Sequence, residues 1–272
     1  NVPGIYAVGT TEVVYTAQDI HGNITLESFT VTVVDSQSPE LAGLPVDLST
    51  DNLLGLCGAN LAWPEPSAAD NCGVESIEST HSPGDEFPVG ITTVIYTVTD
   101  INGNVTNESF QVTIHDVDAP ESDNIPADIT TTSDEGDCGA LVSWTEPVAW
   151  DNCEVIELVS SHENGGFFPV GTTEVTYTAK DDSDLEYSES FLITVSDDEA
   201  PVLIGLAEQV TYSNVEGLCS GLATWDLPSA SDNCEVSEIT STHEPGWSFN
   251  VGSTLVTYTV TDIHGNSSQE VL

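Results

Sequence analysis

Basic residues are almost absent from this sequence. One lysine, Lys180, stands against 46 aspartates and glutamates, which gives a formal net charge of −45 at pH 7. Nucleic acid is thereby excluded as a partner, because phosphate binding requires lysine and arginine. Binding to an anionic membrane surface is excluded for the same reason. One lysine cannot neutralise so many carboxylates, so most of them must face water, salt or bound cations.

Long apolar runs, methionine and the common catalytic motifs are also missing. No stretch of about 18 apolar residues occurs, so neither a transmembrane helix nor membrane insertion is expected. The lack of methionine and of a signal peptide at the start indicates a mature or excised segment of a longer protein. The Gly-x-Ser-x-Gly, His-Glu-x-x-His and P-loop motifs are absent too. The sequence therefore favours a protein that is not an enzyme, and it predicts no catalytic residue.

What the sequence does contain is a repeat with a period of 81 residues. Val-Gly pairs, a tyrosine, an aspartate, a tryptophan and a proline all recur in this register without a gap. The prolines place the end of a first repeat at 1–37, complete repeats at 38–118 and 119–199, and a fourth at 200–272 that stops before its last strand is complete. Both ends fall inside repeats, so we expect a window on a longer array.

Each repeat has an all-β pattern. Apolar side chains alternate with mostly polar ones along 94–99 and again along 110–115, as in half-buried strands. The segment between them, 100–104, is rich in Asp, Asn and Gly, which predicts a hairpin as the last two strands of each repeat. With earlier strands around Trp63 and along 74–80, the pattern favours tandem immunoglobulin-like β-sandwiches arranged as an elongated rod.

The six cysteines follow the same period. Each complete repeat has two of them 15 positions apart, and an even count at fixed spacing predicts one disulfide within each repeat. The predicted pairs are Cys57 with Cys72, Cys138 with Cys153, and Cys219 with Cys234. Closing a loop of that size stabilises by about 3 kcal/mol in the chain-entropy model. Disulfides also imply an oxidising compartment, and hence an extracellular or cell-surface location.

Several short motifs of the second repeat carry a family resemblance. They are Trp-Pro-Glu-Pro at 63–66, Asp-Asn-Cys at 70–72, Phe-Pro-Val-Gly at 87–90, Tyr-Thr-Val-Thr-Asp at 96–100 and Phe-Gln-Val-Thr-Ile at 110–114. Together they resemble the hyalin-repeat (HYR) module over essentially the whole chain. The resemblance implies an Ig-like fold in an extracellular protein, often in long arrays with roles in adhesion. The chain departs from the family pattern at Ser28, Ser109 and Ser190, where family members often have a cysteine.

Calcium is the cofactor that the acidic residues favour, because Ca²⁺ takes roughly six to eight oxygen ligands. Acids lie in the junctions between repeats and at the head of each hairpin turn, and in a sandwich that turn meets the incoming linker. An ion there would stiffen the junction, much as in cadherin-like arrays. The alternative is that aspartate begins turns and precedes proline for backbone reasons alone. The candidate ligands are Asp19, Asp35, Asp100, Asp116, Asp118, Asp181, Asp197, Asp198 and Asp262.

The Asp-Asn-Cys segments add a third set of carboxylates: Asp70, Asp151 and Asp232. A turn beside a disulfide is the simpler interpretation of these residues. A bond between Cys57 and Cys72 would fold the intervening loop back along the strand of Trp63 and carry Asp70 away from the junction. One histidine also recurs in each of three repeats: His81, His162 and His243. These histidines are predicted to pack or face solvent, because a metal site needs several converging ligands. N-glycosylation sequons begin at Asn23, Asn104, Asn107 and Asn266.

The predicted function is mechanical: a structural or adhesive segment of a long extracellular filament or surface adhesin. A repeat-based module that binds a glycan or a protein is the alternative, and it would expose Trp247, Phe167 or Phe168. A spacer in a larger secreted enzyme is a third interpretation. The expected partners are neighbouring repeats of the same chain, and further candidates are copies of itself in a fibre and a surface glycan or protein.

Overall fold

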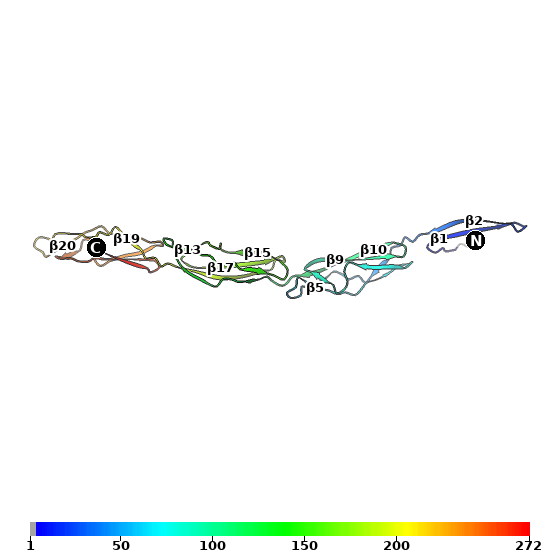
Figure 1. The fold of residues 1–272 in the computed structure, drawn as a ribbon, viewed down its shortest axis with the longest axis horizontal. Coiled ribbons are helices and arrows are strands. Elements are labelled where there is room, and N and C mark those ends of the chain that lie inside the picture. Colours follow the sequence, from blue (N-terminus) through cyan, green and yellow to red (C-terminus); the bar gives the residue numbers. More distant parts are fainter. Residues whose placement is uncertain (1–3) are drawn as a thin grey trace. The chain divides into compact units, whose positions relative to one another are not determined.

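The computed structural model describes residues 4–272, and every helix or strand assigned within that range is a β-strand (Figure 1). Accordingly, the described residues form no helix long and apolar enough to cross a membrane. The chain forms two compact units. One contains the residues up to Asp118 together with Asp151–Cys153, and the other contains Ala119–Trp150 together with Glu154–Leu272.

A single long hairpin represents the first repeat. Its strands, β1 (Gly9–Gln18) and β2 (Ile24–Val33), pair antiparallel from Gly9 opposite Val33 to Gln18 opposite Ile24. Apolar residues on this hairpin remain accessible: Phe29 is 50% exposed. The hairpin therefore carries the apolar pattern of a sandwich strand without a sandwich core over it.

The second repeat contains eight strands in three sheets. They are β3 (Glu40–Ala42), β4 (Leu48–Asp51), β5 (Gly58–Asn60), β6 (Ser67–Ala69), β7 (Val74–Ser79), β8 (Glu86–Pro88), β9 (Gly90–Asp100) and β10 (Val105–His115). The main sheet has the order β4-β10-β9-β7, with β4 parallel to β10, and β3-β6 and β5-β8 are two-stranded sheets. The long hairpin β9–β10 confirms the one predicted from the alternating pattern.

The third repeat has the same arrangement. Its strands are β11 (Glu121–Asp123), β12 (Ile129–Thr132), β13 (Gly139–Leu141), β14 (Val148–Trp150), β15 (Val155–Ser160), β16 (Phe167–Pro169), β17 (Gly171–Asp181) and β18 (Glu186–Ser196). The sheets are β12-β18-β17-β15, β11-β14 and β13-β16. Figure 1 shows β15 and β17 side by side in this repeat.

The fourth repeat has seven strands: β19 (Val202–Ile204), β20 (Ser220–Leu222), β21 (Ser229–Ser231), β22 (Val236–Ser241), β23 (Ser248–Asn250), β24 (Thr257–Asp262) and β25 (Ser267–Val271). Its main sheet has three strands in the order β22-β24-β25. The last strand is present but has 5 residues, against 11 in β18.

Each of the last three repeats has its own core, built from the alternating face that the sequence predicts. In the second repeat Val94, Tyr96, Phe110 and Ile114 are buried with Trp63. The indole Nε1 of Trp63 donates to the Tyr96 hydroxyl at 2.9 Å, which satisfies the polar end of a buried aromatic. The same bond recurs from Trp144 to Tyr177 and from Trp225 to Tyr258. These three tryptophans are thus core anchors.

Candidate metal centre

The cysteines do not pair as predicted. Cys57 bonds Cys153 in one compact unit, and Cys138 bonds Cys234 in the other, each across 96 residues. The proposed pairs 15 positions apart are wrong, and the reason is geometric. The loop before Cys57 contacts the outgoing linker, where Gly55 N–H donates to Asp118, whereas Cys72 lies beside Asp35 of the incoming linker. The two cysteines of one repeat therefore sit at opposite ends of their sandwich, beyond disulfide reach.

Two cysteines remain reduced: Cys72, which is partly buried, and Cys219, which is exposed. The Cys72 thiol hydrogen-bonds to the carboxylate of Asp35, and this bond, together with burial and the negative charge, raises the pKa of the thiol to about 11.

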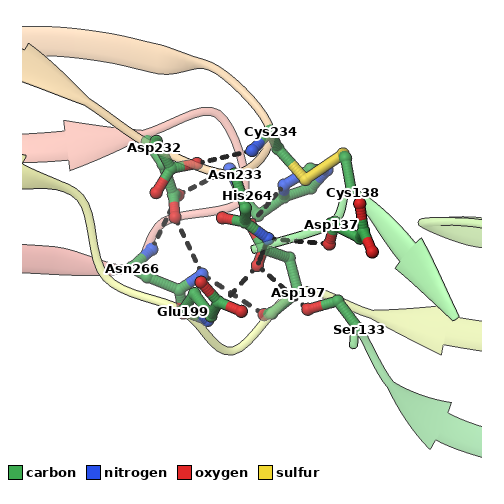
Figure 2. Close-up of polar contacts among 11 residues, drawn as sticks. Ser133, Asp137, Cys138, Asp197, Glu199, Asp232, Asn233, Cys234, His264 and Asn266 are labelled. Atoms are coloured by element: carbon green, nitrogen blue, oxygen red, sulfur yellow. Dashed lines mark hydrogen bonds and ion pairs between the residues drawn. A yellow bond between two sulfur atoms is a disulfide. The ribbon is translucent and has the colours of Figure 1, made fainter. Parts of the chain in front are cut away.

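The candidate centre lies in the second compact unit, where the linker 197–201 enters the fourth repeat (Figure 2). Asp262 heads the hairpin turn there and is 2% exposed. Its Oδ1 accepts the backbone N–H groups of His264 and Asn266, each at 2.8 Å, and its Oδ2 accepts the Asn266 amide at 2.8 Å. An aspartate fits this position because its side chain replaces the backbone acceptors that a tight turn lacks.

The linker meets this turn, as the sequence predicts. The Asn266 side-chain amide also donates to the backbone carbonyl of Asp197 at 3.2 Å. The Asp197 carboxylate is inaccessible to solvent, and its Oδ2 lies 3.0 Å from Nδ1 of His264. The turn and the linker are thus fixed to one another by polar contacts.

The Asp-Asn-Cys segment 232–234 also comes to the junction. The Asn233 amide donates to the Asp197 carboxylate and to the backbone carbonyl of Asp137, both at 3.1 Å. Asp232 accepts the Cys234 N–H at 3.0 Å. Figure 2 shows the Cys138–Cys234 disulfide beside these contacts. The expectation that this aspartate lies away from the junction rested on the wrong cysteine pairing and is corrected with it.

Three carboxylates therefore converge. One oxygen each from Asp197, Asp232 and Asp262 lie within 4.8 Å of one another. Among the described residues, Asp232 Oδ1 and Asn233 Oδ1 are buried and have no hydrogen-bond partner. Two carboxylates at that distance repel by on the order of 3 kcal/mol at an effective dielectric constant of ~20. The arrangement thus concentrates negative charge beside two oxygens that lack donors.

Protonation does not relieve this charge at Asp197. Burial of the side chain opposes ionisation, but hydrogen bonds from Asn233, the Glu199 backbone and His264, with the charge of His264, outweigh it and hold the pKa of Asp197 below its usual value. The carboxylate is therefore ionised at neutral pH.

The junction around Asp35, in the other compact unit, has the same framework with a different cluster. Asp100 heads the turn and is fully buried; burial favours its neutral form, but hydrogen bonds from Asn104, Asn102 and Gly103 lower its pKa overall. The Asn104 amide reaches the Asp35 backbone carbonyl at 3.4 Å. The ligand atoms that gather here belong to Asp35, Asp70 and the thiol of Cys72.

The remaining predicted ligands also make local contacts of their own. Asp19 is exposed at its turn, where the Asn23 side chain and nearby backbone N–H groups lower its pKa. Asp116 accepts from the Asp118 N–H at 3.2 Å. The Asp118 carboxylate accepts from the Gly55 N–H at 2.8 Å and so fixes the loop before Cys57 to the outgoing linker. Asp181 caps its turn through the N–H of Leu185. Asp198 is exposed and belongs to none of the clusters in the described residues.

The other predicted sites are placed as follows. The side-chain amides of Asn23, Asn104 and Asn266 each donate to the aspartate of their own turn, whereas Asn107 is exposed on β10 and accepts from Thr97 through its Oδ1. His81, His162 and His243 pack against the rings of Phe87, Phe168 and Phe249 at centroid distances of 5.1, 5.6 and 5.3 Å. These contacts agree with the expectation that the histidines pack or face solvent.

Sequence reasoning ranked Asp232 low and missed Asn233 and His264. The signal for Asp232 was available in the cysteine period, because a spacing of 96 residues is as regular as one of 15. His264 occupies a turn position where the other repeats have His21, Asn102 and Ser183, so periodicity did not single it out.

Comparison with known proteins agrees with the resemblance to the HYR module that the sequence motifs indicate. The HYR domain profile matches residues 34–114, 115–195 and 197–270. Hyalin of Strongylocentrotus purpuratus is 35% identical over 280 residues, covering 99% of this chain and 23% of the relative. Hyalin of Lytechinus variegatus is 38% identical over 275 residues, covering 97% and 52% respectively. The chain thus spans about half or less of these relatives. Among solved structures, extracellular cadherin domains 1–4 of protocadherin gamma B7 align with 97% of this chain and 82% of their own length, at 15% identity. The TM-score of 0.34 is too low for this similarity to support a structural argument.

Proposed function

Because the chain belongs to the HYR domain family, we propose that it is a structural and adhesive segment of an extracellular protein, stiffened by calcium at the junction between consecutive repeats. The two disulfides join residues of consecutive repeats. They also support an oxidising, extracellular location. The proposed role is mechanical: the chain would transmit force along its repeats.

The observation that carries the calcium proposal is the convergence of Asp197, Asp232 and Asp262 with no lysine or arginine to balance them; His264 is the one basic side chain that contacts the set in the described residues. The one lysine, Lys180, pairs with Asp184 at 2.7 Å in the turn of the third repeat. A hard divalent cation is the natural counter-ion for such a set, because Ca²⁺ prefers carboxylate and amide oxygens. The unpartnered oxygens of Asp232 and Asn233 supply two ligand atoms that no donor occupies among the described residues.

The position of the cluster supports a mechanical role for the ion. Asp197 belongs to the linker, Asp262 to a hairpin turn and Asp232 to the segment bound through Cys234 to the third repeat. An ion held by all three would tie these segments together and resist bending at the linker. His264 binds Asp197 from the other side as a hydrogen-bonding partner, since a nitrogen ligand does not suit calcium.

Calcium titration of the chain tests this proposal. We expect calcium to raise the melting temperature, since a ligand that binds only the folded state at 100 times its Kd adds about 2.7 kcal/mol of stability. Small-angle scattering should show a longer particle with calcium than with chelator. The Asp198→Asn variant, altered at an exposed linker acid outside the cluster, is the matched control and should respond like the parent. If calcium changes neither the melting temperature nor the particle length, the acidic residues at the junction only accept hydrogen bonds that stabilise the turns.

Glycan binding is the second candidate, since it was expected to expose Trp247, Phe167 or Phe168, and two of these three are accessible. Trp247 is 52% exposed and Phe167 is 54% exposed, whereas Phe168 is buried. Trp247 and Phe167 do not occupy equivalent positions, because Trp247 corresponds in the period to Gly166. A site repeated in each unit is therefore not supported. Glycan-array binding that Trp247→Ala abolishes would favour this function over the mechanical one.

A further inference from the structure

Two N-glycosylation sequons follow one another in the hairpin β9–β10, and the structure gives them different surroundings. The first, residues 104–106, begins in the turn, and the second, residues 107–109, lies on β10. A sequon contributes an asparagine amide, which receives the sugar, and a hydroxyl two positions later. The accessibility of these two groups in the folded chain therefore separates a sequon that tolerates a sugar from one that does not.

Both groups of the first sequon hold the linker that enters the second repeat. The Asn104 amide donates to Oδ2 of Asp100 at 2.7 Å and to the backbone carbonyl of Asp35 at 3.4 Å. The Thr106 hydroxyl donates to the backbone carbonyl of Pro39 at 2.6 Å. A sugar on the amide would replace one of its two protons and add bulk against the linker. The first sequon therefore serves to fasten the turn to the linker.

The fourth repeat uses the same pattern in the same way. The Asn266 amide donates to Oδ2 of Asp262 at 2.8 Å and to the backbone carbonyl of Asp197 at 3.2 Å. The Ser268 hydroxyl donates to the backbone carbonyl of Pro201. An asparagine followed two positions later by a hydroxyl is thus explained at this place by the packing of the turn, without any modification.

The second sequon has none of these contacts. Along β10, Asn107 and Ser109 alternate with the buried Phe110, so they lie on the outer face of the main sheet, opposite the core. Asn107 is exposed, and its Oδ1 accepts from the Thr97 hydroxyl at 2.7 Å. Within residues 4–272 no hydrogen bond engages the Asn107 Nδ2 or the Ser109 hydroxyl. Both groups of this sequon are therefore free in the folded repeat.

Apolar side chains lie beside this sequon on the same face. Ile95 is 40% exposed and stands opposite Ser109 in the ladder, which makes it a diagonal neighbour of Asn107. Ile91, further along β9, is 67% exposed. Diagonal neighbours on one face of a sheet lie about 7–8 Å apart. The first sugars of a chain attached to Asn107 would therefore extend over these side chains.

The third repeat has neither the sequon nor the isoleucines on this face. Ser188 stands at the position of Asn107, and Thr172 and Thr176 stand at the positions of the isoleucines. Ser188 and Thr178 form a hydrogen bond between their hydroxyls at 2.8 Å. The outer face is thus polar where no sugar can be attached, and it exposes apolar side chains where one can.

We propose that Asn107 carries an N-linked glycan, which covers Ile91 and Ile95 on the outer face of the second repeat. The proposal rests on the extracellular location proposed above, because such glycans belong to secreted proteins. The donor is an oligosaccharide linked to a lipid through pyrophosphate. Nδ2 of Asn107 forms a bond to the anomeric carbon of the first sugar and loses a proton, while the bond from that carbon to the pyrophosphate breaks and releases the lipid pyrophosphate.

The test is to express the chain behind a secretion signal in animal cells and to map the sugars on the secreted protein. Peptide N-glycosidase in heavy-oxygen water converts each glycosylated asparagine to a labelled aspartate, which fragment mass spectra locate. We expect the label at Asn107, and none at Asn104 or Asn266. Ser109→Ala, which removes the free hydroxyl, should abolish the label at Asn107. Glu108→Gln, at the middle position of the sequon, is the matched control and should keep it.

A second measurement concerns the apolar face. The unglycosylated Asn107→Gln variant should bind about twice as much of a dye for apolar surface as the glycosylated parent. Adding Ile91→Thr and Ile95→Thr, the residues of the third repeat, should return dye binding to the level of the parent.

Three results would overturn the proposal. One is a secreted chain that lacks the label at Asn107, and another is equal labelling of Asn104 and Asn107, which would show that the turn tolerates a sugar. The third is equal dye binding by the parent and Asn107→Gln. Because the label is read by mass without any ion, its absence is distinct from a failure of the chain to respond to calcium.

Discussion

The junctions around Asp35 and Asp197 have the same framework and different polar clusters. In each, an asparagine of the hairpin turn donates to the linker carbonyl. They differ at the asparagine of the Asp-Asn-Cys segment. The Asn71 amide donates to the sulfur of Cys72 at 3.2 Å, whereas the Asn233 amide donates to Asp137 and Asp197. A thiol joins the acids at the first junction, and a third carboxylate joins them at the second.

The difference shows which parts of the site one repeat can build. The turn and the linker suffice for the framework, since both junctions have it. The second junction adds the loop 133–138, which bonds Cys234 through Cys138 and accepts from Asn233 through Asp137. The carboxylate cluster at this junction is therefore accompanied by contacts from both the third and the fourth repeat.

Removing the disulfide should make the second junction resemble the first, and this is the largest expected effect. Cys138→Ser with Cys234→Ser opens a link across 96 residues, and the chain-entropy model gives at most about 4–5 kcal/mol for a loop of that length. We expect a fall of several degrees in the melting temperature of the fourth repeat, measured by calorimetry. Cys219→Ser, which breaks no bond in the monomer, is the control. An unchanged melting temperature in the double variant would mean that the junction holds without its disulfide.

The asparagine of the Asp-Asn-Cys segment should matter at one junction and not at the other. Asn233→Ala removes two hydrogen bonds and leaves a buried carbonyl and a carboxylate without their donor. The expected loss of unfolding free energy is about 1–3 kcal/mol, measured by urea denaturation in chelator. Asn71→Ala removes a contact to sulfur and should lower the free energy of unfolding by at most roughly a few tenths of a kcal/mol. Equal losses for the two variants would refute the distinction between the junctions.

Calcium affinity should separate the junctions in the same direction. Asp232→Asn keeps an acceptor for the Cys234 N–H but removes one charge from the three-carboxylate cluster. We expect calcium binding at this junction to weaken about tenfold or more, equivalent to about 1.4 kcal/mol, by isothermal titration calorimetry. Asp70→Asn, at the junction with two carboxylates and a thiol, should have the smaller effect. The site lies elsewhere if Asp232→Asn binds calcium like the parent.

The hairpins, the three cores and the meeting of turn and linker could be predicted because they follow from local patterns. Alternation places Val94 and Phe110 in the core, and Asx geometry places Asp262 at the head of its turn. The disulfide pairing could not be obtained in this way, since intervals of 15 and 96 residues fit the period equally well. Choosing between them requires knowing at which end of the sandwich each cysteine lies. Asp232 was misjudged as a consequence, because its place follows from that of Cys234.

The smallest expected effect concerns protons at the second junction. Asp197 has a lowered pKa in the folded chain, so its ionised form stabilises the fold above the unfolded pKa of about 3.9. That contribution is lost as the pH falls through the folded value, so the effect belongs below about pH 4. In chelator, Asp197→Asn should show a shallower fall in melting temperature with acid than the parent, while Asp198→Asn should follow the parent. Because Asn233 and His264 are the donors that keep Asp197 ionised, an equally steep fall in Asp197→Asn would mean that their hydrogen bonds add nothing to the stability of this junction.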